Sequence, residues 1–275
     1  MSPLIIEAAG TTDVGSVRQY NEDSIMFDAE RGLMVLADGM GGHRAGEVAS
    51  RMVIESLLTT LQDKVVLFSP DDDPVSLRPV VEQSIIRAND EIFAAAQSNP
   101  NWHGMGTTLV VAAFHGRRVT LAHVGDSRIY RLRFNRLQLL TRDDSLLRDQ
   151  VELGLIAAAD AGGSHNRNLV TRAIGIDARV KPHLRDDEIL AGDLYLLCSD
   201  GLNDLVDDND IELIMNSLKV NLPLAVHHLV QAAKDNGGHD NVSAIIVRLR
   251  EAAPADRSRS WFGRLLAWFR HGSGG

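Results

Sequence analysis

Residues 35–42 read Val-Leu-Ala-Asp-Gly-Met-Gly-Gly and join an apolar run to a carboxylate and a cluster of glycines. The apolar residues 33–37 predict a buried β-strand that ends at Asp38. Glycines allow positive φ and let the backbone approach a bound group closely. A carboxylate followed by such backbone suits a hard cation such as Mg²⁺ or Mn²⁺. An isolated Asp-Gly pair is more often a β-turn, so a metal site needs further support.

That support comes from repetition of the pattern along the chain. An aspartate stands beside three other apolar strands: Asp126 after residues 119–124, Asp200 after residues 193–198, and Asp240 before residues 242–249. Aspartates at the ends of strands far apart in sequence are what an all-carboxylate site assembled across a sheet requires. The sequence therefore predicts a metal centre built from several segments.

Composition limits the classes of protein to consider. The 275 residues, 44% hydrophobic and 24% charged, suffice for one large globular domain or two small ones. A net charge of −9, from 37 acidic and 28 basic residues, argues against a nucleic-acid-binding protein. It does not exclude phosphorylated ligands, because bound cations reverse the local sign of the charge.

The single cysteine and the absence of long apolar runs bear on location. Cys198 lies in an apolar segment, which predicts a core residue in a reducing compartment, with neither a disulfide nor a thiolate zinc site. Residues 1–10 lack the basic and apolar regions of a signal peptide, and no run of about 18 apolar residues suggests a membrane span. We expect a cytoplasmic protein, with the C-terminal tail as the one candidate for membrane association.

Hydrophobic periodicity predicts the fold class. Residues 107–141 alternate with period two and contain hairpin-length connections, as in an antiparallel meander. Helical spacing predicts helices over residues 45–61, 75–97, 209–218 and 222–235. Hairpin-linked strands with helices in pairs indicate an α+β fold rather than a parallel βαβ sheet. Residues 143–175 carry little core material and are expected to form a mobile flap.

The C-terminal tail, residues 251–275, is distinct from the body. After a linker, one face of a helical wheel holds Trp261, Phe262, Leu265, Leu266, Trp268 and Phe269, and the other holds Arg264, Arg270 and His271. Residues 261–271 are therefore expected to pack on the body, to dock on a partner protein, or to lie on a membrane surface.

From about residue 11 to residue 249 the sequence resembles the metal-dependent serine/threonine protein phosphatases of type 2C (the PPM family), in its bacterial branch. The matching motifs are residues 18–23 (Arg-Gln-Tyr-Asn-Glu-Asp), 37–42, 106–108 (Gly-Thr-Thr), 124–128 (Val-Gly-Asp-Ser-Arg), 168–175, 199–202 (Ser-Asp-Gly-Leu) and 240–241 (Asp-Asn). Their joint occurrence in order is specific. The resemblance implies a four-layer αββα sandwich: two central antiparallel sheets flanked by helical pairs, with a small flap subdomain. Residues 1–250 would form the catalytic domain.

The resemblance also implies a site. Asp38 would bridge two Mn²⁺ or Mg²⁺ ions, and the Gly39 carbonyl would bind one of them. Asp200 and Asp240 would complete the two-ion site, with waters filling the remaining positions.

Further residues match the family's site. Glu22 would act on the second ion directly or through water, with Asp23 supporting it nearby. Asp126 and Asp204, together with Asp200, match a third-ion site, and Arg18 matches the phosphate-holding arginine.

The implied activity is hydrolysis of phosphoserine and phosphothreonine in proteins, opposing a bacterial Ser/Thr kinase. Paired cations can lower the pKa of a bridging water from about 15.7 towards roughly 7 and hold it for in-line attack. A forked guanidinium grips two phosphoryl oxygens at once. No covalent phosphoenzyme is needed.

The chain departs from the family pattern at two places. Eukaryotic relatives often carry a histidine where this chain has Met40, and His43 is not assigned that role, so the general acid stays open. Many relatives read Asp-His-Ser where this chain has Asp143-Asp144-Ser145. That difference concerns flap anchoring or substrate contacts more than metal chemistry.

Two alternative functions fit parts of the same pattern. A catalytically weak phosphoprotein-binding module on the same fold would be favoured by loss of a core aspartate, but Asp38, Asp200 and Asp240 are all present. A metal phosphodiesterase usually recruits several histidine ligands, and none of the ten histidines forms a His-x-His pair.

Overall fold

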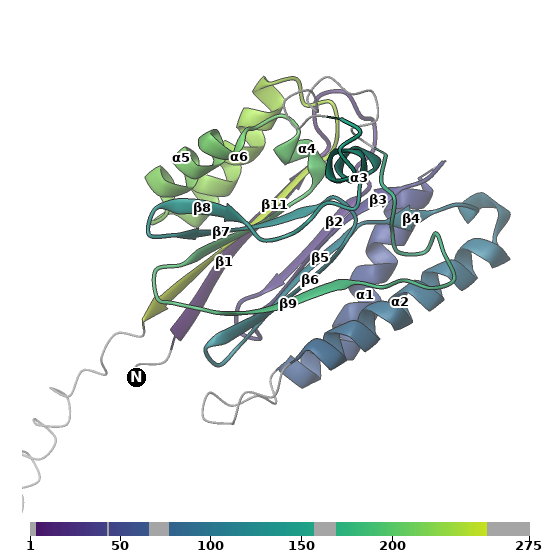
Figure 1. The fold of residues 1–275 in the computed structure, drawn as a ribbon, viewed down its shortest axis with the longest axis horizontal. Helices are drawn as coiled ribbons and strands as arrows, with labels where there is room; N and C mark the ends of the chain where they lie inside the picture. The colour runs from purple at the N-terminus through teal and green to yellow at the C-terminus, as the bar shows by residue number, and fades with distance from the viewer. Residues whose placement is uncertain (1–3, 43, 66–76, 157–168, 252–275) are drawn as a thin grey trace, which may run out of the picture.

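The computed structural model describes residues 4–42, 44–65, 77–156 and 169–251. Two antiparallel sheets lie face to face at its centre (Figure 1). The first sheet has the order β1 (Leu4–Asp13), β11 (Val242–Glu251), β10 (Leu194–Cys198), β7 (Arg128–Arg133) and β8 (Arg136–Leu139). The second has the order β2 (Asp23–Asp28), β3 (Leu33–Met40), β5 (Leu109–His115), β6 (Arg118–Val124) and β9 (His183–Glu188), with β4 (Gly106–Thr107) paired to β3.

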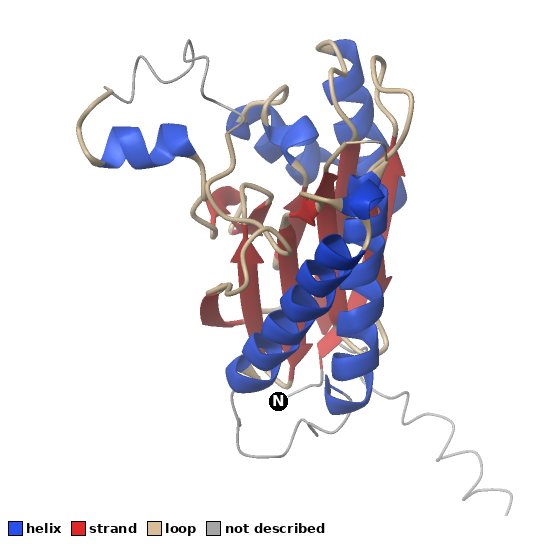
Figure 2. Ribbon diagram, turned by 90° about the vertical axis from the view of Figure 1, so that its right-hand side faces the viewer, coloured by secondary structure: helices blue, strands red, loops and turns tan. Residues whose placement is uncertain are grey.

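Two pairs of helices form the outer layers. Helices α1 (Ala45–Val65) and α2 (Arg78–Ser98) cover the second sheet and run side by side across its strands (Figure 2). Helices α5 (Asp208–Leu218) and α6 (Leu222–Asp235) cover the first sheet. Short elements complete the body: a 3₁₀ turn η1 (Pro100–Trp102), α3 (Leu146–Glu152) and α4 (Asp200–Asn203). The predicted αββα sandwich is confirmed.

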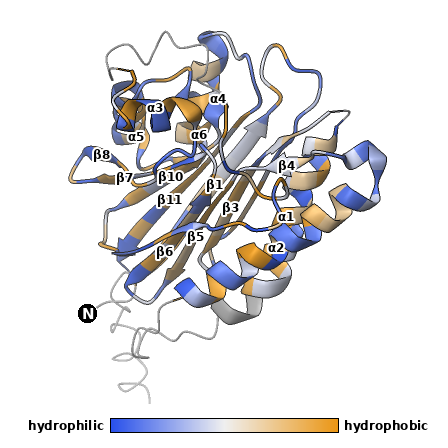
Figure 3. Cartoon of the chain, turned by 45° about the vertical axis from the view of Figure 1, so that its right-hand side comes forward, coloured by the Kyte–Doolittle hydropathy of each residue, from blue (hydrophilic) through white to orange (hydrophobic). Residues whose placement is uncertain are grey.

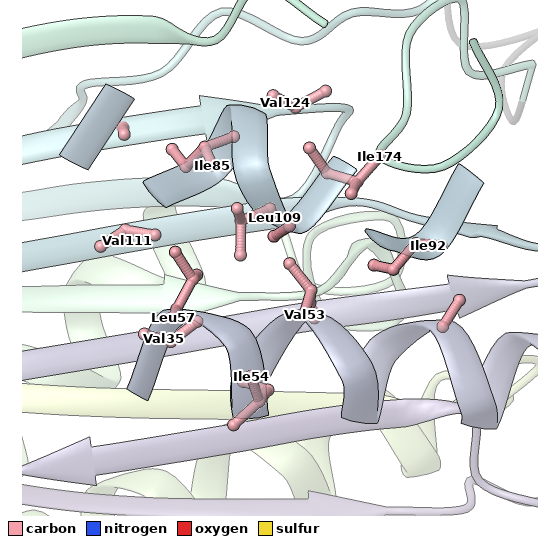
Figure 4. Close-up of a cluster of buried hydrophobic side chains, with 14 of the residues drawn as sticks. Val35, Val53, Ile54, Leu57, Ile85, Ile92, Leu109, Val111, Val124 and Ile174 are labelled. Carbon is pink, nitrogen blue, oxygen red and sulfur yellow. The ribbon is translucent and has the colours of Figure 1, made fainter. Parts of the chain in front are cut away.

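The strand that precedes Asp38 is buried on both faces. Leu33, Val35 and Ala37 point to helices α1 and α2, where Val35 packs near Val53 and Leu57 (Figure 4). Met34 and Leu36 point to the opposite sheet. This explains why the sequence here is a continuous apolar run instead of an alternating one. In the outer helices, by contrast, hydrophobic and hydrophilic residues alternate along the chain, as the mixed hydropathy colours of α2 show (Figure 3).

The end of β3 differs from the prediction. The strand was expected to end at Asp38, but it continues through Gly39 and Met40, which pair with Thr107 and Gly106 of β4. The turn follows at Gly41, where φ is 153°. Sequence periodicity missed β4 because a two-residue strand carries no periodic signal.

Cys198 is a core residue, as predicted: it is fully buried at the end of β10, and burial raises its pKa to about 12. None of the helices in the described residues is both long and apolar enough to cross a membrane. The predictions for His43, for residues 157–168 of the flap and for the tail fall outside the described residues.

Candidate metal centre

The backbone of Asp38 is held by the threonines of the Gly106-Thr107-Thr108 motif. The Asp38 carbonyl oxygen accepts from the Thr107 hydroxyl and from the Thr108 amide, both at 2.8 Å. The Asp38 amide donates to Oγ1 of Thr108 at 3.1 Å. Three hydrogen bonds on one peptide segment fix the position from which the carboxylate projects.

Gly39 is required by close packing. A Cβ at this position would lie 2.1 Å from the carbonyl oxygen of Gly46 and 2.5 Å from that of Glu22, closer than any side chain can come. The Gly39 amide donates to the Glu22 carbonyl at 3.2 Å. The glycine thereby lets the loop before β2 and the start of α1 approach Asp38.

Asp23 connects the two sheets at their shared end. It lies opposite Asp38 in the register of β2 and β3, and its Oδ2 accepts from the hydroxyls of Ser199 (2.9 Å) and Ser243 (2.6 Å) of the other sheet. Its second oxygen, Oδ1, is buried without a hydrogen-bond partner among the described residues. Burial is the main reason that its pKa rises to about 6.

One asparagine makes three hydrogen bonds to the loop that carries Arg18. The side chain of Asn241 accepts from the Glu22 amide at 2.8 Å and donates to the carbonyls of Val14 (3.0 Å) and Tyr20 (2.9 Å). Next to it, Oδ2 of Asp240 accepts from Nη2 of Arg18 at 2.7 Å. The Arg18 side chain is 53% exposed, so it lies at the solvent side of the acidic cluster.

The carboxylates converge on Asp38 from separate elements. Burial, followed by repulsion from neighbouring carboxylates, raises the pKa of Asp38 well above its ordinary value. The repelling residues are Asp23 on β2, Asp200 at the start of α4, Asp126 after β6 and Asp240 before β11. Burial and then Asp126, Asp240 and Asp204 likewise raise the pKa of Asp200. The predicted aspartates therefore come together at one end of the sandwich.

The donor set fits a hard divalent cation. Oδ1 of Asp200, like Oδ1 of Asp23, is buried and has no hydrogen-bond partner in the described part of the chain. Buried, mutually repelling carboxylates are costly unless a cation compensates them. Within the described ranges no three His, Cys, Asp or Glu side chains already converge on a single ion position. Mg²⁺ typically takes only one or two carboxylates and keeps several waters.

Comparison with known proteins decides the family. The sequence profile described as "Protein phosphatase 2C" matches residues 14–227. The chain belongs to the protein phosphatase 2C family. The predicted resemblance is thereby confirmed.

Named relatives support the same family. The serine/threonine protein phosphatase PstP of Mycobacterium tuberculosis is 39% identical over 245 residues, which cover 88% of this chain but only 45% of that relative. The serine/threonine phosphatase stp of Listeria monocytogenes is 35% identical over 239 residues, covering 86% of this chain and 93% of the relative. The chain thus spans less than half the length of the mycobacterial protein and nearly all of the listerial one.

Solved structures of the family share the fold. The crystal structure of the M. tuberculosis phosphatase PstP/Ppp superposes with a TM-score of 0.80 at 38% identity, covering 90% of this chain and 100% of that one. The catalytic domain of PstP in complex with two manganese ions gives a TM-score of 0.79 at 37% identity, with the same coverage.

The remaining family positions have clear places in the structure. Glu22 is partly buried in the loop before β2, and burial raises its pKa. Asp126 is buried directly after β6; burial and then the Asp143 carboxylate raise its pKa to about 7. Asp204 caps the C-terminal end of α4, four residues after Asp200.

The sequence analysis assigned no role to the polar residues that hold these type 2C positions, although Ser199, Asn241 and Thr108 lie in its matching motifs. Ser199 and Ser243 fix Asp23, and Asn241 fixes the Arg18 loop. Thr108 also bonds the hydroxyl of Ser127 at 2.7 Å, which links Asp38 to the turn of Asp126. The available signal was a polar residue at the end of a buried strand, but the sequence does not show which strand ends meet.

Proposed function

We propose that this chain hydrolyses phosphoserine and phosphothreonine in proteins at a carboxylate site for two or three Mn²⁺ or Mg²⁺ ions, and that it opposes a bacterial Ser/Thr kinase. The observation that carries the proposal is the convergence of four carboxylates on Asp38, with buried oxygens left unpaired. Relatives named Ser/Thr phosphatases and the two manganese ions in the PstP catalytic domain support it.

The ligand roles follow the donors available. Asp38 would hold both core ions, with the Gly39 carbonyl on one of them. Asp200 and Asp240 would complete the ligands of the other core ion. Glu22 would contribute directly or through water.

Asp126 and Asp204 would extend the site towards a third ion, and Asp23 would hold the ligands in place. Asp126 and Asp204 lie within electrostatic range of Asp200 and would share a third ion with it. Asp23 would orient the ligands, because both serine hydroxyls on its Oδ2 are fixed to the opposite sheet.

The cations, when bound, would supply an activated water and neutralise charge on the phosphoryl group. Arg18 would bind the phosphoryl oxygens of the substrate. A guanidinium has five N–H donors, so its bond to Asp240 leaves donors free for a phosphate. The same bond holds the guanidinium beside the proposed ligands, and the exposure of Arg18 gives substrate access to it.

The wider assignments are proposals of the same kind. Residues 1–250 would form the catalytic domain, with a flap at about residues 143–175 that contacts substrate. The enzyme would act in the cytoplasm, where residues 261–271 dock it on a protein or a membrane surface.

Kinetics on defined substrates test this function. We expect the full chain with Mn²⁺ to release phosphate from phosphoserine and phosphothreonine peptides, and to be far slower on cyclic and linear phosphodiesters. The Asp38→Asn variant serves as the matched blank for contaminating phosphatases. Preferential turnover of diesters, or equal rates for wild type and blank, would overturn the proposal.

A further inference from the structure

Asp144 is a fully buried carboxylate outside the proposed metal ligands. It lies between β8 and α3, and its side chain has no exposed surface. Its Oδ1 forms an ion pair with Arg172, at 2.8 Å from Nη2, and lies 3.0 Å from Nε2 of His183. Its Oδ2 accepts from the amide of Gly125 at 3.2 Å. One carboxylate therefore contacts three separate segments of the chain.

The backbone of Asp144 joins the two ends of the flap. Its carbonyl accepts from the Thr171 amide at 2.8 Å, and two residues later the Leu146 amide donates to the Leu169 carbonyl at 2.9 Å. Ser145 and Val170 form a β-bridge between these bonds. We call residues 143–152 and 169–175 the flap base. Asp144 is hydrogen-bonded or ion-paired to the second segment of the flap base and lies in the first.

The third contact reaches the turn that places Asp126. The Asp144 amide donates to the Gly125 carbonyl at 3.0 Å, and the Gly125 amide donates back to the Asp144 carboxylate. Gly125 has φ of 101°, and a Cβ there would lie 2.8 Å from Cβ of Thr108. This peptide is confined on both sides, so a displacement of Asp144 must move Gly125 and the adjoining Asp126.

Neighbouring contacts strengthen the connection. Asp143 forms a two-nitrogen ion pair with Arg128, whose Nη2 lies 2.7 Å from Oδ2. His183 stacks on His123 with ring centroids 4.6 Å apart, and Nε2 of His123 lies 2.8 Å from the Arg142 carbonyl oxygen. The segment that leads into the flap is therefore held from both sheets.

We propose that Asp144 is a positioning residue that couples the flap base to the Asp126 turn, so that cation binding near Asp126 orders the flap base. The inference rests on the proposed function for the identity of the cation. A buried carboxylate held by charge-assisted bonds transmits displacement well, because losing one bond leaves a buried polar group unpaired. Coupling of this kind is reciprocal, so an ordered flap base must also favour binding of the cation.

Asp144→Asn is the informative variant. Asparagine keeps the volume but replaces one acceptor oxygen by an NH₂ donor. Either the Gly125 amide or the Arg172–His183 pair then faces a donor, so one of the connections is broken. Arg172→Gln is the second variant. It removes the ion pair between the Asp144 carboxylate and the flap base and leaves the backbone bonds in place; Arg172 is 40% exposed, so the fold should tolerate the change.

Hydrogen exchange of the full chain with and without Mn²⁺ measures the coupling. In wild type we expect Mn²⁺ to slow exchange in peptides covering the flap base and in peptides covering residues 33–40. In Asp144→Asn the Mn²⁺-dependent protection of the flap base should fall by about tenfold, within the usual range of coupling energies. Protection of residues 33–40 should persist. Arg172→Gln should give the same pattern to a smaller extent.

Asp193→Asn is the matched control. Asp193 is also a buried carboxylate, held by Nε and Nη2 of Arg133 (2.8 and 2.6 Å) and by the Leu190 amide (2.8 Å), at the other end of β10. It should keep the wild-type Mn²⁺ response. Calorimetric Mn²⁺ titration should also show weaker binding of the last ion in Asp144→Asn, and the phosphopeptide KM should rise more than kcat falls.

Unchanged Mn²⁺-dependent protection in Asp144→Asn would overturn the proposal, as would equal loss in Asp193→Asn. If Asp144→Asn does not fold, the exchange pattern of Arg172→Gln decides between coupling and its absence. A wild-type flap base that does not respond to bound Mn²⁺ would also overturn it. Normal coupling in a protein that releases no phosphate would instead contradict the proposed function alone.

Discussion

Asp38 is the residue on which the proposed site depends. It faces four other carboxylates, and it is the proposed shared ligand of both core ions. Replacing it by alanine should lower kcat by about two orders of magnitude or more, because a water held by paired ions contributes several kcal/mol. Asp200→Ala and Asp240→Ala should be nearly as severe. Steady-state kinetics at saturating Mn²⁺ measure the loss.

The stability of the same variant provides the control. Removing one of several repelling buried carboxylates should leave the unfolding midpoint of the metal-free protein unchanged or raised. A lower midpoint together with lost activity would point to a damaged fold. Retention of more than about a tenth of wild-type kcat would contradict the shared-ligand role.

Arg18 is predicted to act through its geometry as well as its charge. Arg18→Ala should cost about 2–4 kcal/mol of transition-state stabilisation, as for other single charge-stabilising donors. Arg18→Lys should recover only part of this, because an ammonium cannot make the forked contact. The test compares kcat/KM of the wild type, Arg18→Ala and Arg18→Lys. Equal values for the wild type and Arg18→Lys would show that Arg18 acts only as a surface charge.

At the scale of elements, Asn241 holds the Arg18 loop together with the bond from the Ser16 amide to the Gly238 carbonyl. Its three hydrogen bonds reach Val14, Tyr20 and Glu22, and the residue is only 5% exposed. Asn241→Ala should lower the free energy of unfolding by roughly 2–3 kcal/mol, because buried backbone groups lose their partners. Urea denaturation measures this effect. The KM for a phosphopeptide should also rise in Asn241→Ala, because Arg18 loses its fixed position. An unchanged KM would show that the loop keeps its conformation without Asn241.

Elements also show what a sequence can and cannot predict. The strand of residues 33–37 was predictable because it is a continuous apolar run, and the helix of residues 45–61 because its apolar residues recur at helical spacing. The extension of β3 to Met40 was not, since it depends on pairing with a distant two-residue strand. The reason for Gly39 also changed: the sequence suggested backbone freedom, whereas the structure shows space shared with Gly46 and Glu22.

At the scale of the whole molecule, the layer order followed from a family resemblance spread over many motifs. The aspartates could be predicted from sequence because each stands beside an apolar strand. The polar residues behind them could not, because Ser199 and Ser243 meet Asp23 only when the two sheets stack. The same holds for Asp144, whose partners Gly125, Arg172 and His183 are distant in sequence.

The tail provides a prediction for the whole chain. Deleting residues 252–275 should leave kcat on a small aryl phosphate nearly unchanged, because every proposed ligand precedes β11. An isolated helix of about ten residues is marginal in water, so residues 261–271 should order only on contact with another surface. Liposome flotation and self-association of full-length and truncated protein should differ. A large fall in kcat without such differences would show that the tail packs on the catalytic body.

Dependence on a divalent cation is the property to which the acidic cluster points most directly. The decisive measurement is phosphate release from a phosphothreonine peptide by protein whose metal content is known from elemental analysis. We predict no turnover in excess EDTA and recovery of activity when Mn²⁺ or Mg²⁺ is added back. The wild type should bind Mn²⁺, and the Asp38→Asn variant should bind it more weakly. Full turnover by protein shown to be free of metal would contradict it.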